Sequence, residues 1–289
     1  MSQQAILGII GGSGLYHFEG LEDVQSIEVS TPFGKPSAPI MIGSLEGKRV
    51  AFLARHGIGH HILPSEVNYR ANIYALKQLG VRFVVGVSAC GSLRHDYKPG
   101  NFVIPDQVID FTRDRKRSFF GEGLVAHIST ADPYCPSLSR QLYEAALSTG
   151  VEVHQGGTFI TIEGPRFSTR AESHLFRAWG ISIIGMTTCP EIFLAREAEM
   201  CYASLAHITD YDVWHLAEEP VNVEMVIRTL SQNTASAQQA IRTLAAHLDE
   251  HTDCECDRAL EKALITDPAR IPPETRQKLA LLVDKYLKP

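Results

Sequence analysis

The sequence predicts an α/β fold with one mixed, twisted β-sheet flanked by helices, and three observations predict it. The apolar run AILGIIGG over residues 5–12 is typical of a buried strand. Three later stretches share one pattern: an amphipathic helix, a single glycine, then a β-rich run. No linker, internal repeat or shift in composition divides the chain before about residue 250. We therefore expect a single domain over residues 1–289.

The helices of these stretches are expected over residues 65–79, 137–149 and 169–179. The glycines that follow suit the left-handed residue that ends a helix: Gly80, Gly150 and Gly180. Thr169 and Glu172 form a capping box at the start of the third helix. Apolar spacing predicts a long amphipathic helix over residues 223–248, and Pro273 opens a last helix toward residue 287. Residues 223–289 should thus form a helical segment packed on the sheet.

Composition restricts the class of ligand. The chain has 289 residues, 44% of them hydrophobic, and a formal net charge of -6. It contains no Lys/Arg cluster that would follow a phosphodiester backbone, so nucleic acid and anionic membranes are poor partners. It also lacks an apolar run near the roughly 20 residues of a membrane span, and its first residues lack a signal-peptide pattern. We expect a cytoplasmic protein that binds a small molecule.

Two motifs after predicted strands suit an anion. Backbone N–H groups of Gly11-Gly12-Ser13-Gly14 can approach a phosphate, although a glycine turn is also ordinary turn chemistry. The motif is neither a Walker loop, because no Lys follows, nor a complete G-x-G-x-x-G fingerprint. Arg55-His56 follows the run VAFLA, and a guanidinium at a strand end suits phosphate, with a surface ion pair as the alternative.

Two further motifs suit a nucleoside. Asp210 and Asp212 follow a strand-like segment, and a buried carboxylic acid there could protonate a poor leaving group; the alternative is a helix cap or solvated turn. Phe167 lies in the loop 163–168 beside Ser168, where its ring could stack on a flat base or simply fill the core.

Metal and redox signals are weak. His56, His60 and His61 lie among glycines without a carboxylate or cysteine close by, so no metal is expected there, and no cofactor is expected. The chain has six cysteines, which read as reduced thiols except for the pair Cys254-Glu255-Cys256.

Together, in collinear order, the motifs resemble the methylthioadenosine phosphorylases of the trimeric purine nucleoside phosphorylase family. The resemblance covers residues 6–230 through these segments: IIGGSGLY, STPFGKPS, LARHG, LPSEVNYRANIYALK, ACGSL, IEGPRFSTRAES, MTTCPE and TDYD. It implies the nucleoside phosphorylase fold and phosphorolysis of S-methyl-5′-thioadenosine to adenine and 5-methylthioribose 1-phosphate, in methionine and purine salvage. Inorganic phosphate would be a co-substrate.

The resemblance also implies roles for residues at matching positions. Phosphate would contact Ser13, Arg55, His56, Ser88, Ala89 and Thr187. The nucleoside would contact Phe167, Ser168, Met186, Asp210, Tyr211 and Asp212, with Asp210 as the catalytic acid at purine N7. The 5′-methylthio group would meet Val223, Val226 and Ile227, together with His127 from the neighbouring subunit of a homotrimer. The C-x-C pair resembles one found in some members, as a strained disulfide or as two free thiols.

Other interpretations stay open. Specificity could be broader or directed to 6-oxopurines such as methylthioinosine. A nucleosidase would use water in place of phosphate. The glycine turn could also belong to a dinucleotide-binding oxidoreductase or to a non-catalytic nucleotide-binding protein.

Overall fold

The computed structural model describes residues 4–12, 18, 20–215, 222–251 and 253–287; within α5, nothing is described of the side chains of residues 225 and 230–233. The strands are β1 (Leu7–Gly11), β2 (Glu22–Ile27), β3 (Ile40–Leu45), β4 (Lys48–Ala54), β5 (Phe83–Ser92), β6 (Phe102–Ile104), β7 (Gln107–Phe111), β8 (Val153–Gln155), β9 (Thr158–Ile162), β10 (Ile183–Gly185) and β11 (Cys201–Asp210). The helices are α1 (Tyr69–Gln78), α2 (Pro136–Leu147), α3 (Arg170–Ala178), α4 (Thr188–Glu197), α5 (Val223–His247) and α6 (Pro273–Val283), with 3₁₀ turns η1 (Cys256–Arg258) and η2 (Pro268–Arg270).

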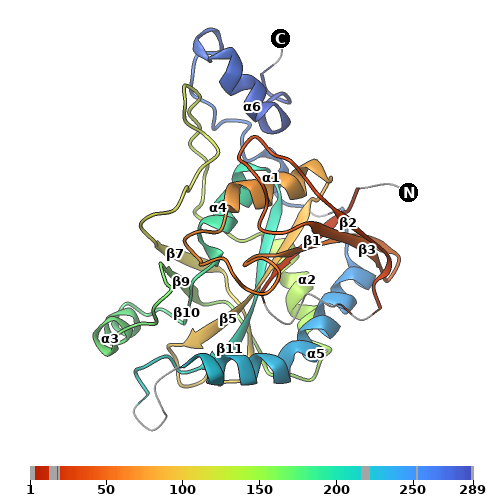
Figure 1. The fold of residues 1–289 in the computed structure, drawn as a ribbon. Helices are drawn as coiled ribbons and strands as arrows, with labels where there is room; N and C mark the ends of the chain where they lie inside the picture. Colours follow the sequence, from red (N-terminus) through yellow and green to blue (C-terminus); the bar gives the residue numbers. More distant parts are fainter. Residues whose placement is uncertain (1–3, 13–17, 19, 216–221, 252, 288–289) are drawn as a thin grey trace.

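The strands join in one 11-stranded mixed sheet, as expected (Figure 1). Its main path runs β2-β3-β4-β1-β5-β10-β9-β7, and β11 pairs with β5 off this path. Strands β4, β1, β5 and β11 are mutually parallel neighbours, so their carboxyl ends lie along one edge. In open α/β sheets this edge is where ligands bind. No helix in the described part of the chain is long and apolar enough to cross a membrane.

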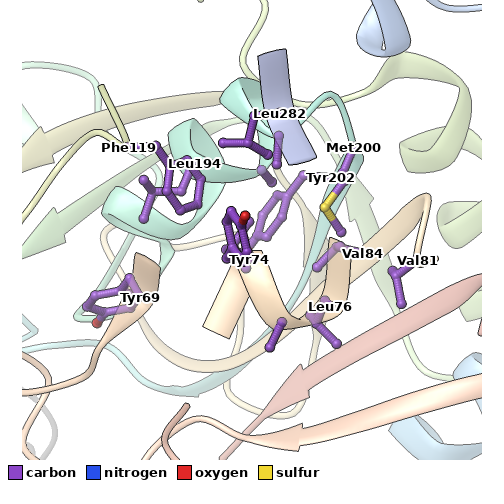
Figure 2. Close-up of a cluster of buried hydrophobic side chains, with 14 of the residues drawn as sticks. Tyr69, Tyr74, Leu76, Val81, Val84, Phe119, Leu194, Met200, Tyr202 and Leu282 are labelled. Atoms are coloured by element: carbon purple, nitrogen blue, oxygen red, sulfur yellow. The ribbon is translucent and has the colours of Figure 1, made fainter. Parts of the chain in front are cut away.

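Helices cover both faces of the sheet. One apolar cluster joins α1, α4 and α6 to the sheet, and Figure 2 shows Tyr74, Leu194 and Leu282 meeting there. A second cluster places α2 and α5 on the opposite side. Residues 50–53 of β4 are all buried and divide between the two clusters, Ala51 and Leu53 in the first and Val50 and Phe52 in the second, because successive side chains of a strand point to opposite faces.

Most predicted elements are confirmed, and the differences have local causes. The first predicted helix begins at Tyr69, because the Asn68 side chain accepts a hydrogen bond from Ala71 N at 3.1 Å and caps it. The run 151–162 forms two strands, since Gly156 and Gly157 adopt positive φ angles of 87° and 107° between them. Strands β2, β3, β6 and β7 and helix α4 were not among the predicted elements.

Candidate active site

A cavity of about 530 Å³ opens at the carboxyl edge of β1, β4, β5 and β11, beside the start of α5. That volume is within the range of small-molecule sites. Most of the residues expected from the sequence line it: Arg55, His56, Ser88, Ala89, Phe167, Ser168, Met186, Thr187, Asp210, Asp212, Val223, Val226 and Ile227. The fold therefore gathers motifs that are far apart in the sequence.

Three expected residues are not in this lining. Ser13 lies outside the described residues, although its neighbour Gly12 lines the cavity. The ring of Tyr211 stacks on His215 with 4.7 Å between the ring centroids, and Tyr211 is not among the residues that line the cavity, so its contact with the nucleoside stays a prediction. The side chain of His127 is exposed and lies outside the cavity of its own chain.

A buried ion pair forms the floor of the cavity. Arg55 is 1% exposed; its Nε donates to Glu191 Oε2 at 2.8 Å and its Nη2 to Glu191 Oε1 at 2.9 Å. The same guanidinium donates to the carbonyls of Val87 and Ile10, and Tyr202 Oη donates to Glu191 Oε1 at 2.7 Å. Burial alone would lower the pKa of Arg55, but the charge of Glu191 raises it overall. The ion pair is therefore internal, not on the surface, and fixes the cation in place.

Polar groups surround this cation. The hydroxyls of Ser88 and Thr187 lie 3.0 Å apart, one from β5 and the other just before α4. His56 Nδ1 lies 2.9 Å from the Ile62 carbonyl, so Nδ1 carries the proton and Nε2 is left as an acceptor. Burial and the Arg55 charge lower the pKa of His56 to about 4, so the ring is neutral at pH 7. Two hydroxyls, an imidazole and a fixed cation are suited to a protonated oxyanion such as phosphate.

Two carboxylates occupy another part of the lining. Asp210 ends β11 and is buried; its Oδ2 accepts from Thr209 Oγ1 and its Oδ1 from Asp212 N, both at 2.7 Å. Oδ2 of Asp212 has no hydrogen-bond partner within the described residues, and neither has Ser168 Oγ. Burial raises the pKa of Asp212. Unpaired buried polar atoms are costly, so a bound ligand would gain by satisfying them.

Arg115 was missed by the sequence analysis, yet it holds the surrounding loops together. Its buried guanidinium donates to the carbonyls of Met186 at 2.7 Å, Cys189 at 2.6 Å and Glu163 at 2.8 Å. These carbonyls belong to the loop that precedes Phe167, to the connection that carries Met186 into the cavity and to the start of α4. One arginine thus positions two walls of the site.

His207 was also missed. It lies in β11, is 2% exposed, lines the cavity and has no partner for either ring nitrogen among the described residues. Its ring packs against Phe102 at 4.7 Å, and burial lowers its pKa to about 4. A histidine inside the apolar run CYASLAHI is a signal that could have found it. Glu191 gave no comparable signal, because only the fold pairs it with Arg55.

The Phosphorylase superfamily model matches residues 6–246 of this chain. The chain therefore belongs to the phosphorylase superfamily. The S-methyl-5′-thioadenosine phosphorylase of Geobacter sulfurreducens is 53% identical over 285 residues, which cover 98% of this chain and 100% of the relative. The S-methyl-5′-thioadenosine phosphorylase of Synechocystis is 51% identical, and the match covers 99% of this chain and 89% of the relative. Within the superfamily, the chain belongs to the S-methyl-5′-thioadenosine phosphorylase family.

Solved structures agree with this assignment. A methylthioadenosine phosphorylase from an Antarctic soil metagenomic library has a TM-score of 0.93 at 48% identity, covering 97% of this chain and 99% of its own. The Schistosoma mansoni methylthioadenosine phosphorylase in complex with adenine has a TM-score of 0.84 at 38% identity. The match covers 89% of this chain and 96% of that chain. The α/β fold with a mixed central sheet is thus confirmed.

Proposed function

We propose that this protein cleaves S-methyl-5′-thioadenosine with inorganic phosphate, giving adenine and 5-methylthioribose 1-phosphate. The observation that carries the proposal is the division of one cavity into a cationic, hydroxyl-lined part around Arg55 and a carboxylate part around Asp210. The first suits an anionic nucleophile and the second a purine leaving group. The ribose then lies between them, against Met186.

At the phosphate part, the reaction needs electrostatic positioning more than covalent catalysis. The bond from C1′ to N9 breaks with its electron pair leaving on the purine, and the ribose acquires oxocarbenium character, as in other glycosyl transfers. Phosphate oxygen then forms the new bond to C1′. Ser88, Thr187 and His56 would orient the phosphate while Arg55, fixed by Glu191, stabilises its charge.

At the base part, Asp210 would serve the purine N7. The departing adenine gathers negative charge, and a proton delivered to N7 lowers the barrier. Two hydrogen bonds, from Thr209 Oγ1 and from Asp212 N, fix the Asp210 carboxyl group. Asp212 and Ser168, with their unpaired oxygens, would complete the contacts to the base.

The 5′ part has an apolar, incomplete wall. Val223 and Ile227 line the cavity but are 62% and 56% exposed, so a large part of each side chain is uncovered in the isolated chain. An apolar wall suits a methylthio group and leaves a 5′-hydroxyl unsatisfied. We infer that a neighbouring subunit closes this side in a homotrimer, with its His127 as a contributor. Light scattering should give three times the chain mass; a monomer would overturn the trimer.

The experiment that tests the function measures base release from methylthioadenosine, adenosine, methylthioinosine and inosine, with and without phosphate. We expect strict phosphate dependence and a preference for the first substrate. Release of base without phosphate would support a nucleosidase, and equal use of 6-oxo substrates would support the broader specificity. If no base is released under any of these conditions, the result would support a non-catalytic nucleotide-binding protein. These readouts separate reaction class from specificity in one set of measurements.

A further inference from the structure

Four cysteines that are dispersed in the sequence meet at one point in the fold, away from the cavity. Their Sγ atoms all lie within 4.8 Å of one another: Cys135, Cys201, Cys254 and Cys256. The Sγ atoms of Cys201 and Cys254 lie 3.4 Å apart. Three of the four side chains are buried and Cys254 is half-buried. We call this group the four-cysteine cluster.

Rigid elements hold the cluster in place. Cys135 is the N-cap of α2 and Cys201 is the first residue of β11; the backbone N–H of Cys135 donates to the Tyr202 carbonyl at 2.9 Å, which ties the two elements together. Cys254 and Cys256 follow α5, and Cys256 opens η1. The cluster therefore joins the C-terminal segment to the sheet and to α2.

We propose that the four-cysteine cluster binds one Zn²⁺ ion in a tetrahedral all-thiolate site. Zn–S bonds are about 2.3 Å long, so the sulfurs of such a tetrahedron lie about 3.8 Å apart. The Sγ–Sγ distances in the cluster include 3.4 Å for Cys201 and Cys254 and do not exceed 4.8 Å, so they lie on both sides of that spacing. Only small side-chain movements are needed to close the site. Soft thiolate ligands in tetrahedral geometry select zinc over hard cations.

The charge of the site is compensated. Four thiols release four protons as the ion binds, which leaves a net charge of −2 on the metal and its ligands. Arg196 places Nη1 3.5 Å from Cys256 Sγ, and its Nη2 donates to the Asp132 carbonyl at 2.7 Å, which holds the guanidinium there. The amino end of α2 begins at Cys135 and adds partial positive charge. The Arg196 cation and the amino end of α2 thus both stabilise the thiolates.

The site is structural, not catalytic. Cys201 begins β11 and Asp210 ends it, and a strand of that length spans about 30 Å. Four protein ligands also leave no open position for substrate. Zinc would therefore stabilise the attachment of residues 254–287 without taking part in phosphorolysis. The proposal does not depend on the proposed function.

Disulfides are the competing chemistry. Each would need a two-electron oxidant and an approach of the sulfurs to about 2.05 Å. From the sequence, the C-x-C pair could be two free thiols or a disulfide. The sequence did not indicate that Cys135 and Cys201 lie beside it. Two disulfides among these residues would leave two of the six thiols titratable in denatured protein.

The test measures zinc and thiols on the same protein, purified without chelator. We expect one zinc per chain by mass spectrometry, six thiols in denaturant with chelator, and tetrahedral-thiolate absorption bands when Co²⁺ replaces zinc in the wild type. Cys256→Ser should lose the zinc, whereas Cys189→Ser, a buried cysteine outside the cluster, should keep it.

Metal-free protein with six thiols, or with two, would overturn the proposal. If Cys256→Ser does not fold, the zinc content and the Co²⁺ spectrum of the wild type decide. Removal of zinc by a chelator should lower Tm while the kcat of the protein that remains folded is retained. Retained Tm after complete zinc removal would contradict the structural role.

Discussion

Arg55 and Glu191 form a buried, doubly hydrogen-bonded ion pair beneath the cavity, with N–O distances of 2.8 Å and 2.9 Å. They come from segments 136 residues apart, the first after β4 and the second within α4. Because both side chains are almost fully buried, the carboxylate compensates a cation that the protein could not otherwise hold there. The stability of the fold and the proposed phosphate site thus both depend on this pair.

Glu191→Gln should leave the Arg55 cation buried without its counter-charge. We expect the free energy of unfolding to fall by about 3–5 kcal/mol, the usual cost of breaking a buried pair. Urea denaturation measures this directly. Asp96→Asn is the matched control, because the Arg94–Asp96 pair is exposed and should change stability by about 1 kcal/mol or less. A loss of that small size for Glu191→Gln would contradict the account.

Asp210→Asn tests the proton donor. An amide keeps the shape and cannot deliver a proton, so kcat for methylthioadenosine should fall by about 10²–10⁴-fold with a smaller change in KM. Asp212→Asn offers the comparison, since a base-binding residue should change KM more than kcat. Wild-type kcat in Asp210→Asn would end the acid role.

Sequence reasoning found the residues that lie in continuous motifs. Asp210, Phe167 and Thr187 come from segments whose order and chemistry are readable along the chain, and the fold brings them to one cavity. Local rules also placed α3, because the Thr169 capping box and Gly180 are short-range signals. These successes rest on information that lies within a few residues.

The residues that were missed depend on contacts across the fold. Glu191 meets Arg55, and Arg115 meets three carbonyls from other segments, so neither partner is visible from spacing. Cys135 and Cys201 join the C-x-C pair only because α2 and β11 start side by side. Tyr211 belongs to the TDYD motif that carries the resemblance, and its ring stacks on His215; its contact with the nucleoside stays a prediction.

His207 makes stability depend on pH. Its pKa is about 4 in the folded protein against roughly 6.5 in the unfolded chain, so the unfolded state binds more protons between those values. Stability should therefore fall as pH decreases from 6.5 toward 4, by about 2 kcal/mol from this residue between pH 7 and pH 5. His207→Leu should reduce that loss in urea titrations. His247→Gln, an exposed histidine, should not. An equal acid loss in wild type and His207→Leu would contradict the assignment.

The apolar wall at the 5′ part of the cavity should determine the choice between a methylthio group and a hydroxyl. Burying a 5′-hydroxyl against Val223, Val226 and Ile227 without a partner costs about 1–3 kcal/mol, so the wild type should favour methylthioadenosine over adenosine by roughly 10- to 100-fold in kcat/KM. Val226→Thr keeps the side-chain shape and supplies a hydroxyl, so the ratio should fall several-fold while KM for phosphate is retained. Val24→Thr, at an exposed position on β2, is the control and should leave the ratio unchanged. Equal kcat/KM for the two nucleosides in the wild type would show that these side chains do not set the choice.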